Sequence, residues 1–299
     1  MIIRVRFGKE GALRFIGHLD VLRTFQKIFR RAEIPMVYSQ GYSPHPIMSF
    51  ALPLGLGLSS EGEYLDAEIE EMAVQSPPPA SLCEAPSPAS GGGQAVVDEV
   101  AFPFGEGGPP TQSVVDEVLK RLRAATSPEL PVYAVRVLSE KAGNAMASVG
   151  RARYRLTFRE DLAKPLAAAA DRLLAEKQHI IEKKTKTQTV SFDLRPCLYE
   201  VTVIRAEGSG EEPHPPASQD DPLFAPHCLR IAQAPPPAFP GGGEAVLLLV
   251  LSAGSKANVK PELVWEELLK TAGLPAEEKP LAIRRLDLMT EDGSSLGEV

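Results

Sequence analysis

The chain has 299 residues, of which 43% are hydrophobic and 24% charged, and its formal net charge is −7. This is a globular composition, long enough for two ordinary domains. A membrane protein is excluded, because the longest aliphatic run, residues 245–251, is far shorter than the roughly 20 residues of a membrane helix. From the start, MIIRVRF, we expect no signal peptide, and from the three widely spaced cysteines we expect no disulfide framework. We expect a soluble, cytoplasmic protein without a membrane partner.

The predicted elements of the first half alternate strand and helix. Apolar residues alternate with charged ones in the strands, and recur at intervals of three and four in the helices. Their order, β-α-β-β-α-β, is the split βαβ or ferredoxin-like pattern. In chain order we expect a strand at 2–7, a helix at 19–32, strands at 36–38, 47–52 and 63–70, a helix at 114–125 and a strand at 131–138.

The second half repeats this order loosely. We expect a strand at 151–158, a helix at 162–175, a hairpin of 180–184 and 187–194, strands at 198–204 and 245–251, a helix at 261–272 and a strand at 282–289. In the first of these strands, three arginines alternate with Ala152, Tyr154 and Leu156. The prediction is an α+β protein of two tandem ferredoxin-like domains, 1–139 and 140–299.

Two stretches interrupt this pattern. Residues 76–113 contain eight Pro and six Gly, and residues 207–243 contain nine Pro and five Gly. Proline removes hydrogen-bond donors and glycine raises chain entropy, so neither stretch can bury enough apolar surface to order itself. We interpret both as flexible insertions, one in each domain.

The acidic average hides two basic segments. Residues 1–50 and residues 140–206 each carry a net charge of +5, so the rest of the chain sums to −17. Such asymmetry is a hint of a site for a polyanion. The alternative is that lysine and arginine merely solvate two faces.

The densest motifs lie between Phe15 and Asp66. They read FIGHLDVLR (15–23), RRA (30–32), YSQGY (38–42), PHP (44–46) and SEGEYLD (60–66). This ordered segment resembles the radical-SAM-linked family of uncharacterised bacterial proteins, and a weaker resemblance continues through 184–196 and 254–269. The family commonly has Ser where this chain has Gly17, which puts a capping or ligand-binding hydroxyl in doubt.

The resemblance implies a radical SAM partner, because the family is often fused to or paired with such a domain. That domain needs a CxxxCxxC motif for its cluster. Cysteines at 83, 197 and 228 cannot provide one, so the chain looks like the accessory half alone, with no cofactor of its own. The family implies no established reaction.

The predicted helix at 19–32 carries a basic stripe. Arg23, Lys27 and Arg31 lie at intervals of four, opposite the apolar face. Such a stripe can track phosphates, although an ordinary amphipathic helix has the same pattern. Arg14 precedes this helix and is a further candidate phosphate contact.

Three residues are candidates for catalysis. His18 and Asp20 stand at the helix start, and His45 lies between Pro44 and Pro46. His18 could act as a general acid or base oriented by Asp20. The alternatives are that Asp20 caps the helix and His18 bonds the backbone. The spacing of the histidines does not favour a metal, and we predict none.

Two further groups are candidates for contact with RNA. The loop around Gln40, Tyr42 and His45 is rigid and could read or stack on bases, or it could pack its tyrosines into the sheet. Lys184 and Lys186 would share one face of the predicted hairpin and contact phosphates. The alternative for this hairpin is solubility or protection of a sheet edge.

The leading hypothesis is therefore an accessory protein that binds RNA or a ribonucleoprotein and serves a radical SAM partner. The second is an enzyme of the RNA-modifying type that uses His18, Asp20 and His45. The third is a protein-binding adaptor. Tandem ferredoxin-like domains also resemble the layout of pseudouridine synthases, but shared architecture implies no catalytic role.

Overall fold

The computed structural model describes residues 1–70, 72, 112–139, 143–184, 189–205 and 243–298. Almost all of the two predicted insertions lies outside these residues. The exceptions are Gln112 and Ser113, which begin a helix, and Gly243. The helix α2 therefore begins two residues earlier than predicted.

In the described residues of the first half there are two long helices and four strands. They are β1 (Ile2–Lys9), η1 (Gly11–Phe15), α1 (His18–Arg31), β2 (Met48–Phe50), β3 (Ser59–Glu68), α2 (Gln112–Ala125) and β4 (Val132–Val137). Both predicted helices are confirmed. The predicted strand at 36–38 is replaced by two isolated bridges, Met36 to Ile69 and Tyr38 to Pro46, and the 3-10 turn η1 was not predicted.

The second half confirms the predicted helices, strands and hairpin to within a few residues. Its elements are α3 (Ala145–Ser148), β5 (Arg151–Arg159), η3 (Glu160–Leu162), α4 (Ala163–Ala175), β6 (Ile180–Lys184), β7 (Thr189–Asp193), η4 (Arg195–Cys197), β8 (Leu198–Arg205), β9 (Glu244–Ser252), α5 (Pro261–Ala272) and β10 (Ala282–Met289). Pro261 begins α5, where a missing N–H costs nothing, and Gly273 ends it with φ +68°.

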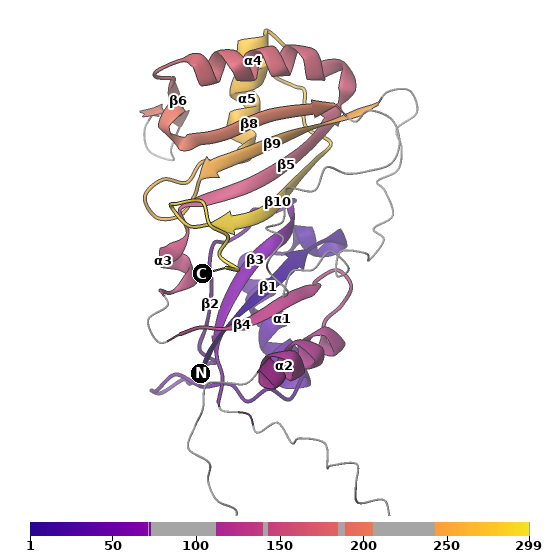
Figure 1. Ribbon diagram of the computed structural model, residues 1–299, viewed down its shortest axis with the longest axis vertical. Helices are drawn as coiled ribbons and strands as arrows, with labels where there is room; N and C mark the ends of the chain where they lie inside the picture. Colours follow the sequence, from indigo (N-terminus) through magenta and orange to yellow (C-terminus); the bar gives the residue numbers. More distant parts are fainter. Residues whose placement is uncertain (71, 73–111, 140–142, 185–188, 206–242, 299) are drawn as a thin grey trace, which may run out of the picture.

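One sheet runs through both halves of the molecule. Its strand order is β4-β1-β3-β10-β5-β9-β8, with β2 also paired to β3. Figure 1 shows β5, β8, β9 and β10 in the upper part and β1, β3 and β4 in the lower part. The halves join where β10 runs parallel to β3, and the other pairings are antiparallel. The hairpin of β6 and β7 forms a separate two-stranded sheet.

Each half has its own apolar core on the helix side of the sheet. In the first half, α1 buries Val21, Phe25, Ile28 and Phe29, and the ring of Phe25 meets that of Phe7 at 4.6 Å between centroids. In the second half, the inward residues of β5 pack with α4 and α5. Successive residues along a strand point to opposite faces, so the residues between these buried ones define the second face of the sheet.

A buried ion pair joins the two halves. Nε of Arg285 in β10 donates to Oε1 of Glu63 in β3 over 2.7 Å, and both side chains are buried. Next to them, a side chain at Gly62 would collide with the carbonyl oxygen of Leu286, which lies 2.3 Å from the position of a Cβ atom. The close approach of β3 and β10 therefore requires glycine at this position.

Candidate nucleic-acid interface

A row of arginines lies on the face of the sheet opposite the helices. Along β5, Ala152, Tyr154, Leu156 and Phe158 are buried, while Arg151, Arg153 and Arg155 are half-buried and alternate with them. Alternate residues of a strand share a face, so the three guanidinium groups stand on one side of the central strand.

This row continues into the first half of the molecule. Arg153 is the register partner of Asp287 on β10. The hydroxyl of Tyr64 donates to Oδ1 of Asp287 over 2.6 Å, and Tyr64 is the register partner of Arg6 on β1. We call the whole surface the arginine face. It comprises Arg4, Arg6, Arg136, Arg151, Arg153, Arg155 and Arg284.

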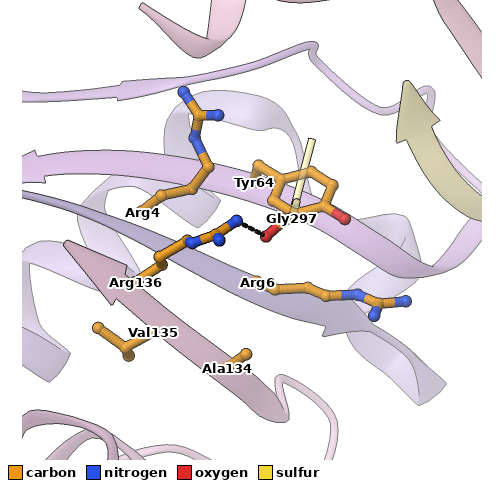
Figure 2. A pocket seen from close by; sticks show the side chains of 7 residues that line it. All are labelled: Arg4, Arg6, Tyr64, Ala134, Val135, Arg136 and Gly297. Carbon is orange, nitrogen blue, oxygen red and sulfur yellow. Dashed lines mark hydrogen bonds between the residues drawn. The ribbon is translucent and has the colours of Figure 1, made fainter. Parts of the chain in front are cut away.

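In the first half, the arginines of this face are held by acidic groups and by carbonyls. Nε of Arg4 donates to Oδ1 of Asp66 over 2.8 Å, and Nη1 donates to the carbonyl of Leu296 over 3.1 Å. Nη1 of Arg136 donates to the carbonyl of Gly297 over 2.7 Å, as Figure 2 shows. The C-terminal segment thus crosses the lower part of the arginine face.

A small pocket opens beside these contacts. It is lined by Arg4, Arg6, Tyr64, Ala134, Val135, Arg136 and Gly297, and Figure 2 shows the three arginines arriving from β1 and β4. Burial opposes the charge of Arg6, but Tyr64, Asp287 and Glu61 together outweigh it and raise the pKa of its guanidinium. Arg6 therefore keeps its positive charge inside the surface.

In the second half, the row of arginines has fewer acidic neighbours. The register partners of Arg151, Arg153 and Arg155 on β9 are uncharged, namely Ser252, Val250 and Leu248. On β10 the partners are Met289, Asp287 and Arg284, and Arg284 is itself paired with Glu61 and lies 3.7 Å from Oε1 of Glu10. The positive charge of this part of the face therefore comes from Arg151, Arg153 and Arg155 themselves, whose partners on β9 are uncharged.

An exposed aromatic ring lies beside this row of arginines. Cζ of Arg151 lies 3.9 Å from the ring centroid of Tyr199, and 47% of Tyr199 is exposed. A stacked arginine and tyrosine offer flat surfaces to an unpaired base, next to cations that can contact its phosphates. The upper part of the arginine face therefore combines the two kinds of group that bind single-stranded nucleic acid.

The sequence-predicted basic stripe lies along the exposed side of α1. Arg23, Lys27 and Arg31 are all exposed. Two of them also have intramolecular partners: Nη1 of Arg23 lies 3.4 Å from Oδ1 of Asp20, and Nη1 of Arg31 donates to the carbonyl of Ala125 over 3.0 Å. These contacts reduce the number of N–H donors that the stripe can offer to a phosphate. Arg14 is exposed, and its Cζ lies 4.7 Å from the ring centroid of Phe15.

The three candidate catalytic residues have different neighbours. His18 packs edge-on against Phe50 at 5.0 Å between ring centroids, and Asp20 is exposed in the first turn of α1. Nδ1 of His45 instead lies 2.9 Å from the hydroxyl of Ser39 in the loop before β2. Within the residues that the structure describes, no group of three His, Cys, Asp or Glu could hold a metal ion.

The other sequence-predicted contacts lie on one loop and on the hairpin of β6 and β7, apart from Lys186. Gln40 and Tyr42 are exposed in the loop that ends at His45, and Tyr42 is fully exposed. In the hairpin, Lys184 is the register partner of Thr189 at the end of β6. Lys186 lies outside the described residues.

Sequence reasoning missed the arginine face and the role of one motif. The alternation of arginines along β5 predicts a strand, but nothing local shows that its polar side faces away from the helices. The motif SEGEYLD turns out to lie on β3, where Glu63, Tyr64 and Asp66 contact Arg285, Asp287 and Arg4. These motif residues hold strands together.

The fold is therefore that of a mixed α/β protein with a large, mostly antiparallel sheet and few helices. A family of uncharacterised proteins conserved in bacteria, DUF2344, matches residues 3–81 and 110–261. The match spans most of the chain, and the chain belongs to this family. A search of the curated proteins finds no match. In the described part of the chain, none of the helices is long and apolar enough to cross a membrane.

Proposed function

We propose that this protein binds single-stranded RNA through the arginine face. The observation that carries the proposal is the row of Arg151, Arg153 and Arg155 beside the exposed ring of Tyr199. Sheet surfaces of this kind bind RNA by stacking bases on aromatic rings, while arginines contact phosphates. The net charge of −7 then confines nucleic acid to the few surfaces where positive charge gathers.

A radical SAM partner belongs to the same proposal. Its support is the run of motifs between Phe15 and Asp66, in which Gly17 is the departure from the family pattern. In this proposal the protein presents RNA to a partner that carries out the chemistry. The alternative of an enzyme based on His18, Asp20 and His45 is not favoured, because His45 is bonded in a different loop.

We also propose that each half is a ferredoxin-like unit. The strand orders β4-β1-β3-β2 and β10-β5-β9-β8 support this, since both follow the same sequence of neighbours around two helices. In this arrangement the helices cover one face of a sheet, which leaves the other face available for binding.

The test measures binding of a labelled, unstructured RNA by fluorescence anisotropy at low salt. We expect Arg153→Ala to weaken binding several-fold, because it removes a phosphate contact from the centre of the row. Lys164→Ala is the matched control, since Lys164 is exposed on α4, on the helix side. Equal affinities for these two variants would contradict the proposal.

The same assay separates the arginine face from the surfaces predicted from sequence. Lys27→Ala tests the stripe on α1, and Lys184→Ala tests the hairpin. If these two variants lose affinity while Arg153→Ala does not, RNA binds to the protein on a different surface from the one proposed.

A further inference from the structure

Three large apolar side chains lie exposed beside the start of α1. Leu56, Phe15 and Leu19 are 66%, 63% and 63% exposed. Apart from Tyr42, they are the most exposed large hydrophobic side chains among the described residues. Apolar surface in contact with water is unfavourable, and patches of it mark sites of interaction. We call these three residues the apolar patch.

The residues of the apolar patch come from three segments that meet. Phe15 ends η1, and Leu19 lies in the first turn of α1. Leu56 lies in the chain that leads from β2 to β3. The N–H of Gly57 donates to the carbonyl of Arg14 over 2.8 Å. This hydrogen bond holds the chain at Leu56 against the chain at Phe15, so the patch is built by the fold rather than by one element.

Positive charge flanks the apolar patch. Arg14 lies in η1, and Arg23 and Lys27 follow the patch along α1, one and two turns beyond Leu19. All three cations are exposed. One acid, Asp20, lies among them, with its Oδ1 3.4 Å from Nη1 of Arg23, and the chain from 52 to 58 carries no charge. Three cations and one acid leave the border of the patch positive.

A protein segment fits this surface better than RNA does. Leucine side chains have no flat π-face on which a base could stack, whereas the core of a protein interface is apolar and its rim is polar. A second copy of this chain fits less well, because a two-fold contact sets the same patch against itself. Arg14 and Arg23 would then face their own copies, and like charges oppose association.

We propose that the apolar patch is the docking site for an acidic segment of a partner protein. Apolar side chains of that segment cover Phe15, Leu19 and Leu56, while its Asp or Glu residues face Arg14 and Arg23. The apolar contacts supply most of the affinity, and the charges select acidic partners and speed association. Because the patch is built on η1 and α1, it lies on the helix side of the sheet, opposite the arginine face. The inference does not depend on RNA binding.

The test selects peptides from a phage-displayed library of random sequence on the immobilised full chain. Fluorescence anisotropy then measures the binding of the enriched peptides. We expect these peptides to combine leucine or phenylalanine with an excess of Asp and Glu. Leu19→Ser/Leu56→Ser should weaken their binding by about tenfold or more. The matched control, Met146→Ser/Ile180→Ser, replaces two exposed apolar residues elsewhere and should retain it.

A second variant tests the charges that flank the patch. Arg14→Glu/Arg23→Glu should weaken binding of the same peptides several-fold at low salt, and less at high salt, because salt screens exposed charges. Lys164→Glu/Lys177→Glu is the matched control, since it reverses two exposed charges away from the patch. Equal losses in these two variants would contradict the role of Arg14 and Arg23.

Several results would overturn the proposal. They are the enrichment of no peptide, enriched peptides without an acidic excess, and equal binding by the wild type and Leu19→Ser/Leu56→Ser. A wild-type dimer that this variant dissociates would place a second copy on the patch, and a loss of affinity for labelled RNA would place nucleic acid there. If the variant melts well below Met146→Ser/Ile180→Ser, the chain itself covers the patch.

Discussion

At the scale of single residues, the start of α1 is a helix N-cap without a capping side chain. Gly17 is the N-cap with φ −76° and ψ 165°, a conformation that any residue can adopt. The nearest atom to a Cβ built there is Oδ2 of Asp20 at 3.7 Å, which is ordinary contact. A serine in this conformation would have a hydroxyl able to cap the helix.

We therefore expect Gly17→Ser to stabilise the protein by a few tenths of a kcal/mol, because its hydroxyl can accept from a first-turn N–H. Gly17→Ala should destabilise it, since alanine offers no acceptor. Urea unfolding of the three proteins measures this order. If Ser and Ala have the same effect, capping is not what this position contributes.

At the scale of elements, β3 is the strand of the first half that joins it to the second half. It pairs with β1 and β2, and its first residues pair with β10. Two buried ion pairs extend from it, Glu63 to Arg285 and Asp66 to Arg4. Removing one partner of such a pair leaves a buried charge without compensation.

We expect Glu63→Gln to lower the free energy of unfolding by about 3–5 kcal/mol, because it leaves Arg285 unpaired beside Lys9. The double variant Glu63→Gln/Arg285→Met should recover part of the loss, since no unpaired guanidinium remains. Denaturant unfolding of the single and double variants gives the coupling between the two side chains. Additive effects would show that the pair does not act as a unit.

The elements themselves could be predicted from sequence, because their signals are local. The spacing of Phe25 and Phe29 gives α1, and the alternation around Tyr154 gives β5. The parallel pairing of β10 with β3 could not be predicted, since it joins residues more than two hundred positions apart. The pairing of β3 with β1 also contains a bulge, because β3 has one extra residue between Ser60 and Glu63. The sequence did not predict this bulge, which decides the faces on which Glu61 and Glu63 lie.

The candidate site was harder to predict from sequence for the same reason. Arg151, Arg153 and Arg155 are evident as an alternating set, but their function depends on which side of the sheet the helices cover. His18 and His45 belong to neighbouring motifs of the sequence. In the structure, however, His18 packs on Phe50, whereas His45 is bonded to Ser39. Motif density marked this segment as unusual, but not that Glu63, Tyr64 and Asp66 hold β3 to its neighbours.

At the scale of the whole molecule, the sheet buries phenol groups, and this makes stability depend on alkaline pH. Burial raises the pKa of Tyr64, Tyr133 and Tyr154, and Asp287 raises that of Tyr64 further. The unfolded chain releases these protons near pH 10, where the folded protein still holds them. Their contribution to stability is thus complete below the unfolded pKa and is lost as the pH rises above it.

We expect the free energy of unfolding to fall between about pH 9 and 11, by up to about 1.4 kcal/mol per pH unit for each retained proton. Tyr154→Phe should make the decline shallower, because it removes one of the three titrating groups. Urea unfolding across this range measures the slope. A decline as steep in Tyr154→Phe as in the wild type would contradict this explanation.

The central claim is that the arginine face binds RNA, and the salt dependence of binding tests it most directly. Each phosphate contact on a single strand contributes about 0.7 to the slope of log K against log salt concentration. For the triple variant Arg151→Ala/Arg153→Ala/Arg155→Ala, we predict a slope about 2 smaller than that of the wild type. The matched control replaces three exposed lysines, Lys164, Lys177 and Lys279, with alanine. A wild-type slope in the control and a reduced slope in the arginine variant would support the claim, and equal slopes in the two variants would contradict it.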